Sequence, residues 1–331
     1  MRLALGFGLG TFGFGVLLAP WIGPGPKRVA LWVADRDGNQ LVGLDRDFLL
    51  ATSSPLASPV RVEAMADGSA YALSAISGNP IGPHGLVHVD NEGGLQRVGL
   101  LGAGVDLAKV GNQVFVVEMG LWGADSRVLR VELGMGVPGV VSQRSLVPFA
   151  VSPGAVAVGV QSGPGAANPE LSVLVGSDTG RLTRYNAGGA LLQEVMGLAG
   201  EIGDVAPGPD GGWWVLDVAS PNRLLYLDRN LGLLWAVETG LHSESLAPVE
   251  GEPRVWIADT TEPLVRRFGP DGVLELSTST VATDFSRGAG LSSGEFWVAS
   301  PGAALRLDHH GAGLPGQGGF DYLVDLSSVE P

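Results

Sequence analysis

Acidic side chains recur at one end of a repeated segment in this chain of 331 residues. Glu63, Asp106 and Asp204 fall at equivalent places in three copies of the repeat, close to the start of an expected strand. Carboxylates that share a low-dielectric site repel one another, and a divalent cation or an amine relieves that repulsion. These three residues are therefore candidate ligands of a metal, with calcium and zinc as the two options. The equivalent places in three other copies hold Ala155, Ser245 and Gly288.

Five further polar residues lie in the loops that lead to the same end, and they complete the candidate ligand-binding set. They are Glu201, His242, Glu244, Asp284 and Arg287. A structural interpretation stands beside the metal, in which each carboxylate accepts hydrogen bonds from neighbouring strand starts. No complete catalytic set is present at these positions. The sequence therefore assigns no catalytic residue and favours a protein that is not an enzyme.

These positions follow from a repeat that consists of an aromatic or aliphatic residue, two apolar residues and a polar or small residue. Its fourth positions are Asp35, Ser74, Glu118, Gly176, Asp217, Asp259 and Ser300. They are separated by 39, 44, 58, 41, 42 and 41 residues. A four-stranded propeller blade needs roughly 40 to 45 residues, so the spacing predicts one blade per copy. The long interval contains the glycine-rich stretches 134–141 and 161–169, which we interpret as enlarged loops of blade four.

Each copy continues with a second alternating run, such as 224–228, and several show a third, such as 274–276. Period-two alternation indicates strands, and the short turns between them make neighbouring strands antiparallel. We therefore expect an all-β fold, a seven-bladed β-propeller over residues 29–331, with six blades as the alternative. The C-terminal strand at 320–326 would either finish blade seven or complete blade one, and would cover an open sheet edge in both cases. Packing between blades is expected for Trp32, Trp214, Trp256 and Trp297.

The segment from Gly211 to Leu234 resembles an NHL-type repeat, and the segment from Arg254 to Leu276 is similar to it. The pair Asn222-Arg223 after the aromatic strand is the clearest point of likeness. More loosely, residues 29–308 resemble the wider propeller group that includes the gluconolactonase (regucalcin) family. The resemblance implies a propeller and does not select one family.

Gluconolactonase-type hydrolases hold a divalent ion that polarises a lactone carbonyl. The resemblance implies a glutamate, two asparagines and an aspartate on the inner strands as its ligands. No asparagine occupies the aligned positions here, so only Glu63 and Asp204 carry over as ligands, with Asp106 as an unmatched third. This departure weakens the case for hydrolysis.

Several other motif matches are not expected to be functional sites. Residues 134–139 and 311–316 fit the dinucleotide-binding pattern without the strand and helix that it requires. Residues 290–294 fit the nucleophile-elbow spacing but align with hairpin turns of other copies. Asp35, Asp37 and Asn39 imitate part of a calcium loop, in which Arg46 stands where the final glutamate belongs. The pair His309-His310 is expected in a surface turn.

Composition excludes some partners. The formal net charge is −14, and lysine and arginine gather nowhere into a basic patch, so nucleic acid is not an expected partner. The chain has no cysteine, which removes disulfides, thiolate zinc sites and cysteine nucleophiles.

The first 28 residues form a segment of their own. Residues 3–22 carry no charge, follow Arg2, and precede a Gly/Pro linker that ends in Lys27-Arg28. Such a run predicts an apolar helix that is either a signal peptide or a membrane anchor. We expect the protein outside the cytoplasm, in the periplasm, on the cell surface or secreted, with membrane contact through residues 3–22 only.

Two functions from different classes follow. The first is a noncatalytic binding or scaffold propeller for a protein, peptide or glycan, with the 161–169 loop as a contact element. The second is a metal-dependent lactone or ester hydrolase that uses the acidic axial end. No cofactor other than the divalent cation of the second function is expected.

Overall fold

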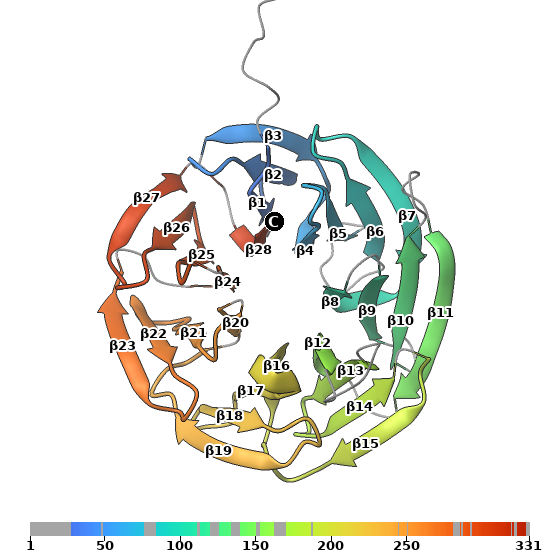
Figure 1. Ribbon diagram of the computed structural model, residues 1–331. Coiled ribbons are helices and arrows are strands. Elements are labelled where there is room, and N and C mark those ends of the chain that lie inside the picture. The colour runs from blue at the N-terminus through green and yellow to red at the C-terminus, as the bar shows by residue number, and fades with distance from the viewer. Residues whose placement is uncertain are drawn as a thin grey trace, which may run out of the picture.

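Seven four-stranded antiparallel sheets are arranged around a central axis in the computed structural model (Figure 1). The structure describes residues 28–47, 49–75, 84–110, 113–119, 126–133, 140–149, 153–161, 170–186, 188–243, 245–249, 251–280, 285, 287–291, 293–318, 320 and 323–328. The prediction of an all-β, seven-bladed propeller is confirmed, and the six-bladed alternative is wrong.

Each blade has four strands that lie side by side in order from the axis to the rim (Figure 1). The innermost strands, for blades one to seven, are β28 (Leu323–Ser328), β4 (Pro59–Ala64), β8 (Ala103–Val110), β12 (Pro153–Gln161), β16 (Ile202–Pro207), β20 (Ala247–Pro248) and β24 (Gly288–Gly290). The second strands are β1 (Leu31–Asp35), β5 (Ala70–Ala75), β9 (Gln113–Met119), β13 (Glu170–Ser177), β17 (Trp213–Asp217), β21 (Val255–Ala258) and β25 (Phe296–Ser300).

The outer two strands of each blade follow in chain order. The third strands are β2 (Gln40–Leu44), β6 (His84–Val89), β10 (Ser126–Leu133), β14 (Leu182–Asn186), β18 (Arg223–Leu227), β22 (Leu264–Phe268) and β26 (Ala303–Leu307). The rim strands are β3 (Leu50–Pro55), β7 (Leu95–Leu101), β11 (Val140–Phe149), β15 (Leu191–Val195), β19 (Leu233–Glu238), β23 (Leu274–Ser279) and β27 (Gly313–Gly318). A short 3-10 turn, η1 (Pro209–Gly211), joins β16 to β17.

The repeat found in the sequence corresponds to the second strand of each blade. These strands are buried along their whole length in blades one, two, five, six and seven. A strand with neighbours on both edges and blades on both faces must be apolar on both faces, which explains the continuous apolar runs. The polar fourth residue then falls where the strand ends.

The C-terminal strand closes the ring. β28 pairs antiparallel with β1, with Leu31 opposite Ser328 and Val33 opposite Leu326. Blade seven already has its rim strand in β27, so the C-terminal strand completes blade one and does not finish blade seven. The Ser327 hydroxyl also accepts a hydrogen bond from the Ala64 amide of blade two, at 3.0 Å.

Large side chains fill the spaces between blades, as expected for the repeated tryptophans. Trp32, Trp214 and Trp256 are fully buried and Trp297 is nearly so. Trp214 packs with Leu216 of its own blade and with Val255, Ile257 and Phe268 of the next. Because each blade hides its apolar faces only against two neighbours, the closed ring stabilises every blade.

Hydrogen bonds from the rim strands to the following blade add to this packing. The Ser54 hydroxyl donates to the Gly93 carbonyl at 2.7 Å, and the Trp235 indole donates to the Pro270 carbonyl at 2.6 Å. The Thr278 hydroxyl donates to the carbonyl of Gly311 at 3.1 Å. In each pair the acceptor lies in the turn before the next rim strand.

Four of the polar residues at the fourth repeat position share a structural role. The Asp217 carboxylate accepts the amides of Gly200 and Glu201, both at 3.1 Å, and the Asp259 carboxylate accepts the amide of His242 at 2.8 Å. These donors lie in the loops that enter the next strand toward the axis. Glu118 binds the Gly102 amide in the same way, and the Ser74 hydroxyl donates to the Ala57 carbonyl.

The long interval between the third and fourth repeats contains lengthened strands. β10, β11, β12 and β13 have 8, 10, 9 and 8 residues, whereas β16, β17, β18 and β19 have 6, 5, 5 and 6. Enlarged loops alone therefore do not account for the interval. Val140 and Val141, expected in a loop of blade four, lie on β11 of blade three, and Gln161 is the last residue of β12. The rest of the two expected loops, residues 134–139 and 162–169, lies outside the described residues.

The predicted N-terminal helix also lies outside the described residues, which begin at Arg28. Within the described part of the chain, no helix is long and apolar enough to cross a membrane.

We predict that Asp217→Ala strongly destabilises the propeller. Asp217 is fully buried, and its removal leaves several amides without their acceptor and leaves the guanidinium of its ion-pair partner Arg223 with the Leu198 carbonyl alone. Leaving such groups unpaired should lower the free energy of unfolding by about 3 kcal/mol or more. Urea denaturation measures the loss.

Asp228→Ala is the matched control. Asp228 accepts the amides of Asn230 and Gly232 in a partly exposed turn, so its loss should cost about 1 kcal/mol. Equal losses for the two variants would contradict the structural role given to Asp217.

Candidate functional site

The innermost strands bring most of the predicted axial residues to the centre of the ring. Glu63 lies on β4, Asp106 on β8 and Asp204 on β16, and Arg287 directly precedes β24. The strand register corrects one predicted equivalence: Asp106 and Asp204 lie opposite the third position of the repeat, and in blade two that place belongs to Arg61 and not to Glu63. The other predicted positions also fall on or beside innermost strands: Ala155 on β12, Ser245 just before β20, and Gly288 at the start of β24. We call the group formed by Arg61, Asp106, Asp204 and Arg287 the axial charge cluster.

Two arginines hold the Asp106 carboxylate. Its Oδ1 lies 3.3 Å from Nε of Arg61 and 3.3 Å from Nη2 of Arg287. The Asp106 side chain is almost completely buried, whereas the two arginine side chains are about a quarter and a fifth exposed. A buried carboxylate of this kind is tolerated because both cations compensate its charge.

Asp204 lies near Asp106 and Arg287 and is also buried. Its carboxylate accepts the amide of Leu246 at 2.7 Å and that of Val205 at 2.9 Å. Burial, partly offset by Arg287 and reinforced by the negative charge of Asp106, raises the pKa of Asp204 to about 6. The hydrogen bond from the Leu246 amide therefore links β16 to the residue just before β20 in the next blade.

Glu63 faces a different cation. Its Oε1 lies 3.9 Å from Nζ of Lys109, and that ammonium also donates to the Ala64 carbonyl. Arg61 and Glu63 are two residues apart on β4, so their side chains share one face of the strand. The central end of blade two therefore presents one positive and one negative group.

The predicted loop residues divide into two groups. Glu201 and His242 are exposed, and their amides donate to the buried carboxylates of Asp217 and Asp259. Through the backbone they fix the loops that enter β16 and the segment before β20. Glu244 and Asp284 lie outside the described residues.

The arrangement does not fit the divalent ion that the gluconolactonase resemblance implies. Within the described ranges, no three histidine or acidic side chains are grouped so that they could hold a metal. Asp106 faces two guanidinium groups and Glu63 faces an ammonium, so a cation here would have to displace internal partners. The carboxylates instead have partners within the protein: Asp204 accepts backbone amides, and Asp106 and Glu63 face cationic side chains.

The other motif matches form hairpin turns or strands where the structure describes them. Gly290 ends β24, and the Gly294 amide donates to the Leu291 carbonyl in the hairpin that leads to β25. Residues 313–316 of the second dinucleotide-binding match lie on the rim strand β27. Asp35 accepts the Gly38 amide, and the His310 amide donates to Asp308 in a rim turn.

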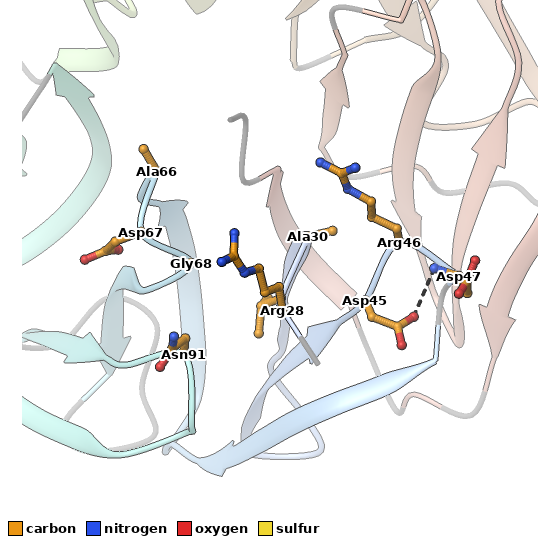
Figure 2. Close-up of a pocket in the computed structure, with 10 residues that line it drawn as sticks. Arg28, Ala30, Asp45, Arg46, Asp47, Ala66, Asp67, Gly68 and Asn91 are labelled. Atoms are coloured by element: carbon orange, nitrogen blue, oxygen red, sulfur yellow. Dashed lines mark hydrogen bonds between the residues drawn. The ribbon is translucent and has the colours of Figure 1, made fainter. Parts of the chain in front are cut away.

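A pocket between blades one and two was not predicted. Its volume is about 720 Å³, and Figure 2 shows it between the entry to β1, the turn after β2 and the turn after β4. The side chains that line it include Arg28, Asp45, Arg46, Asp67 and Asn91. No sequence motif links these residues, because they meet only when two blades pack together.

No protein-family model matches the chain, and no curated protein matches it in sequence. Solved structures share its fold. Virginiamycin B lyase from Staphylococcus aureus is 11% identical with a TM-score of 0.62, covering 85% of this chain and 88% of its own. AztD from Citrobacter koseri is 10% identical with a TM-score of 0.59, covering 91% and 97%. A streptogramin B lyase is 12% identical with a TM-score of 0.60, covering 84% and 91%.

These similarities show a β-propeller fold across most of the chain. At 10–12% identity they show the fold alone, because one fold supports many unrelated sites. Neither the lyase activity in two of the names nor any ligand is transferred to this chain by them.

We predict that Asp204→Asn removes a pH-dependent cost to stability. The folded pKa of about 6 lies above the usual 3.8, so the folded protein binds more protons than the unfolded chain between these values. The ionised carboxylate therefore lowers stability above pH 6, and this cost disappears as the pH falls toward 4. The asparagine keeps one oxygen where the carboxylate accepts two amides, so the variant loses one hydrogen bond at every pH. The stability of the variant relative to the wild type should therefore improve by on the order of 2 kcal/mol between pH 4.5 and pH 7.5.

Urea unfolding at pH 4.5, 6 and 7.5 measures the difference between variant and wild type. Asp228→Asn serves as the control because Asp228 lies in a rim turn away from the axis. A difference that stays constant from pH 4.5 to 7.5 would show that Asp204 is not a costly buried anion.

Proposed function

We propose that the protein is a noncatalytic binding propeller that acts outside the cytoplasmic membrane on a protein, peptide or glycan. The seven-bladed ring supplies a rigid scaffold, and the turns at its two ends are the parts free to contact a ligand. Such modules recognise ligands with surface groups positioned by the blades and need no reactive group.

One observation carries this proposal. The axial carboxylate with the best burial, Asp106, is compensated by Arg61 and Arg287 from two other blades. A hydrolase of the gluconolactonase type needs axial oxygen ligands that remain available to a metal. Here the Asp106 carboxylate is occupied by two internal cations, which supports binding at other surfaces over metal-assisted hydrolysis.

Metal titration separates the two functions. We predict that calcium or zinc leaves the melting temperature unchanged, and that no lactone or ester is hydrolysed in the presence of either ion. A metal that filled a specific site at a hundred times its Kd would add about 2.7 kcal/mol. Differential scanning fluorimetry detects such a gain easily.

The variant Asp204→Ala and the rim control Asp228→Ala complete the test. A rise in melting temperature that only Asp204→Ala abolishes would favour the hydrolase over the binding module. A rise that survives in both variants would indicate metal binding elsewhere.

The location is tested independently. We predict that residues 1–28, fused to a reporter that is active only outside the cytoplasm, direct its export in a bacterial host, because residues 3–22 form an uncharged run long enough to enter the membrane. A fusion of residues 23–28 alone is the control. An inactive, cytoplasmic reporter in the full fusion would contradict the proposed location.

A further inference from the structure

The pocket between blades one and two has the size and position of a ligand site. Its volume of about 720 Å³ lies within the range of small-molecule pockets. The turn Ala66–Gly68 after β4 forms one side, and the segment Arg28–Ala30 before β1 forms another. The indole of Trp32 donates to the Gly68 carbonyl at 2.9 Å and fixes these two sides relative to each other.

Two arginines in this pocket have no partner among the residues that the structure describes. Neither Arg28 nor Arg46 makes a hydrogen bond or ion pair with another described residue, and both are exposed. Several other described arginines of this acidic chain are paired, among them Arg223 with Asp217 and Arg306 with Glu295. In Figure 2 the side chains of Arg28 and Arg46 extend in the same direction into the open space.

Two of the three neighbouring carboxylates, those of Asp45 and Asp67, already accept hydrogen bonds from nearby residues. Asp45 accepts the amides of Asp47 and Leu49 at 3.0 and 2.9 Å. Asp67 accepts the amide and hydroxyl of Ser69 at 2.9 and 2.6 Å, and its carboxylate points away from both arginines in Figure 2. The guanidinium groups are therefore the charged donors left for a ligand, and they suit a carboxylate or phosphate.

The other residues that line the pocket indicate what kind of molecule carries the carboxylate or phosphate. Asn91 and Asp47 add an amide and a carboxylate that can bind hydroxyl groups, and both are exposed. Ala30 and Ala66 are small and leave room for a ring between these polar groups. A hydroxylated ring that carries one acidic group matches this combination of donors, acceptors and space.

We propose that this pocket binds an acidic sugar, a uronic acid or a sugar phosphate, through the guanidinium groups of Arg28 and Arg46. This inference rests on the proposed binding function and gives it a site and a ligand class. The sugar is either free or the terminal residue of a glycan, since both offer the same chemistry to the pocket.

Isothermal titration calorimetry of the full chain tests the site with glucuronate, glucose 6-phosphate, a uronic-acid oligosaccharide, neutral glucose and inorganic phosphate. We expect at least one acidic sugar to bind, and neutral glucose and inorganic phosphate to bind at least about tenfold more weakly. Arg28→Gln and Arg46→Gln should each lower the affinity for the acidic sugar by about tenfold or more, as expected for loss of a charge-assisted hydrogen bond. The oligosaccharide shows whether the source is a free sugar or a glycan end.

Arg97→Gln is the matched control, because Arg97 is exposed on β7 of blade two and does not line the pocket. It should leave affinity unchanged. Ala66→Trp should block the pocket, and because Ala66 is exposed the variant should keep the melting temperature of the wild type. These variants separate a local site from a general effect of charge.

Three results would overturn the inference. Binding of inorganic phosphate as tight as that of the sugars means an adventitious ion only. Acidic-sugar binding unaffected by Arg28→Gln, Arg46→Gln and Ala66→Trp places the site elsewhere and leaves the binding function standing. If no acidic sugar binds, the ligand class is wrong, and an array of neutral glycans and peptides then decides whether the proposed binding function fails as well.

Discussion

A buried polar residue at the end of the second strand is the constraint on which much of the propeller depends. Asp217 and Asp259 bind the amides of the loops that turn toward the axis, and Ser74 binds a carbonyl in the same place. Each interaction fixes where the innermost strand begins relative to its blade. Because these groups have no access to water, losing one partner costs more than an exposed hydrogen bond would. The innermost strands are therefore placed accurately around the centre.

This accurate placement allows charges from different blades to meet. Arg61 on β4 and Arg287 before β24 reach the same carboxylate oxygen of Asp106 on β8. Asp204 on β16 joins the group, and burial there raises its pKa to about 6. Two buried carboxylates at the centre would destabilise the ring without the arginines. The arginines consequently serve the assembly of the ring, because they compensate the negative charge that is buried at its centre.

The sequence predicted the architecture well because the repeat records a local requirement. Each second strand must be apolar on both faces and polar at its end, and this pattern is visible without a structure. The strand that closes blade one could not be chosen from the sequence, because an apolar run at the C-terminus satisfies either sheet edge. The axial partners were also missed. Arg61 shares a strand face with Glu63, two residues away, but its ion pair is with a residue of the next blade.

The two arginines of the pocket show a second limit of predicting a site from a repeat pattern. In the sequence, Arg28 ends the linker before the propeller, and Arg46 stands only where the final glutamate of a calcium loop would belong. Both positions lie at the edges of blade one, where the alternating pattern ends and no motif applies. Only the packing of blade one against blade two brings them to the same cavity with Asn91. Blade interiors are constrained by the repeat, so differences in specificity among propellers can arise at the seams between blades, where single exposed residues change without disturbing the core.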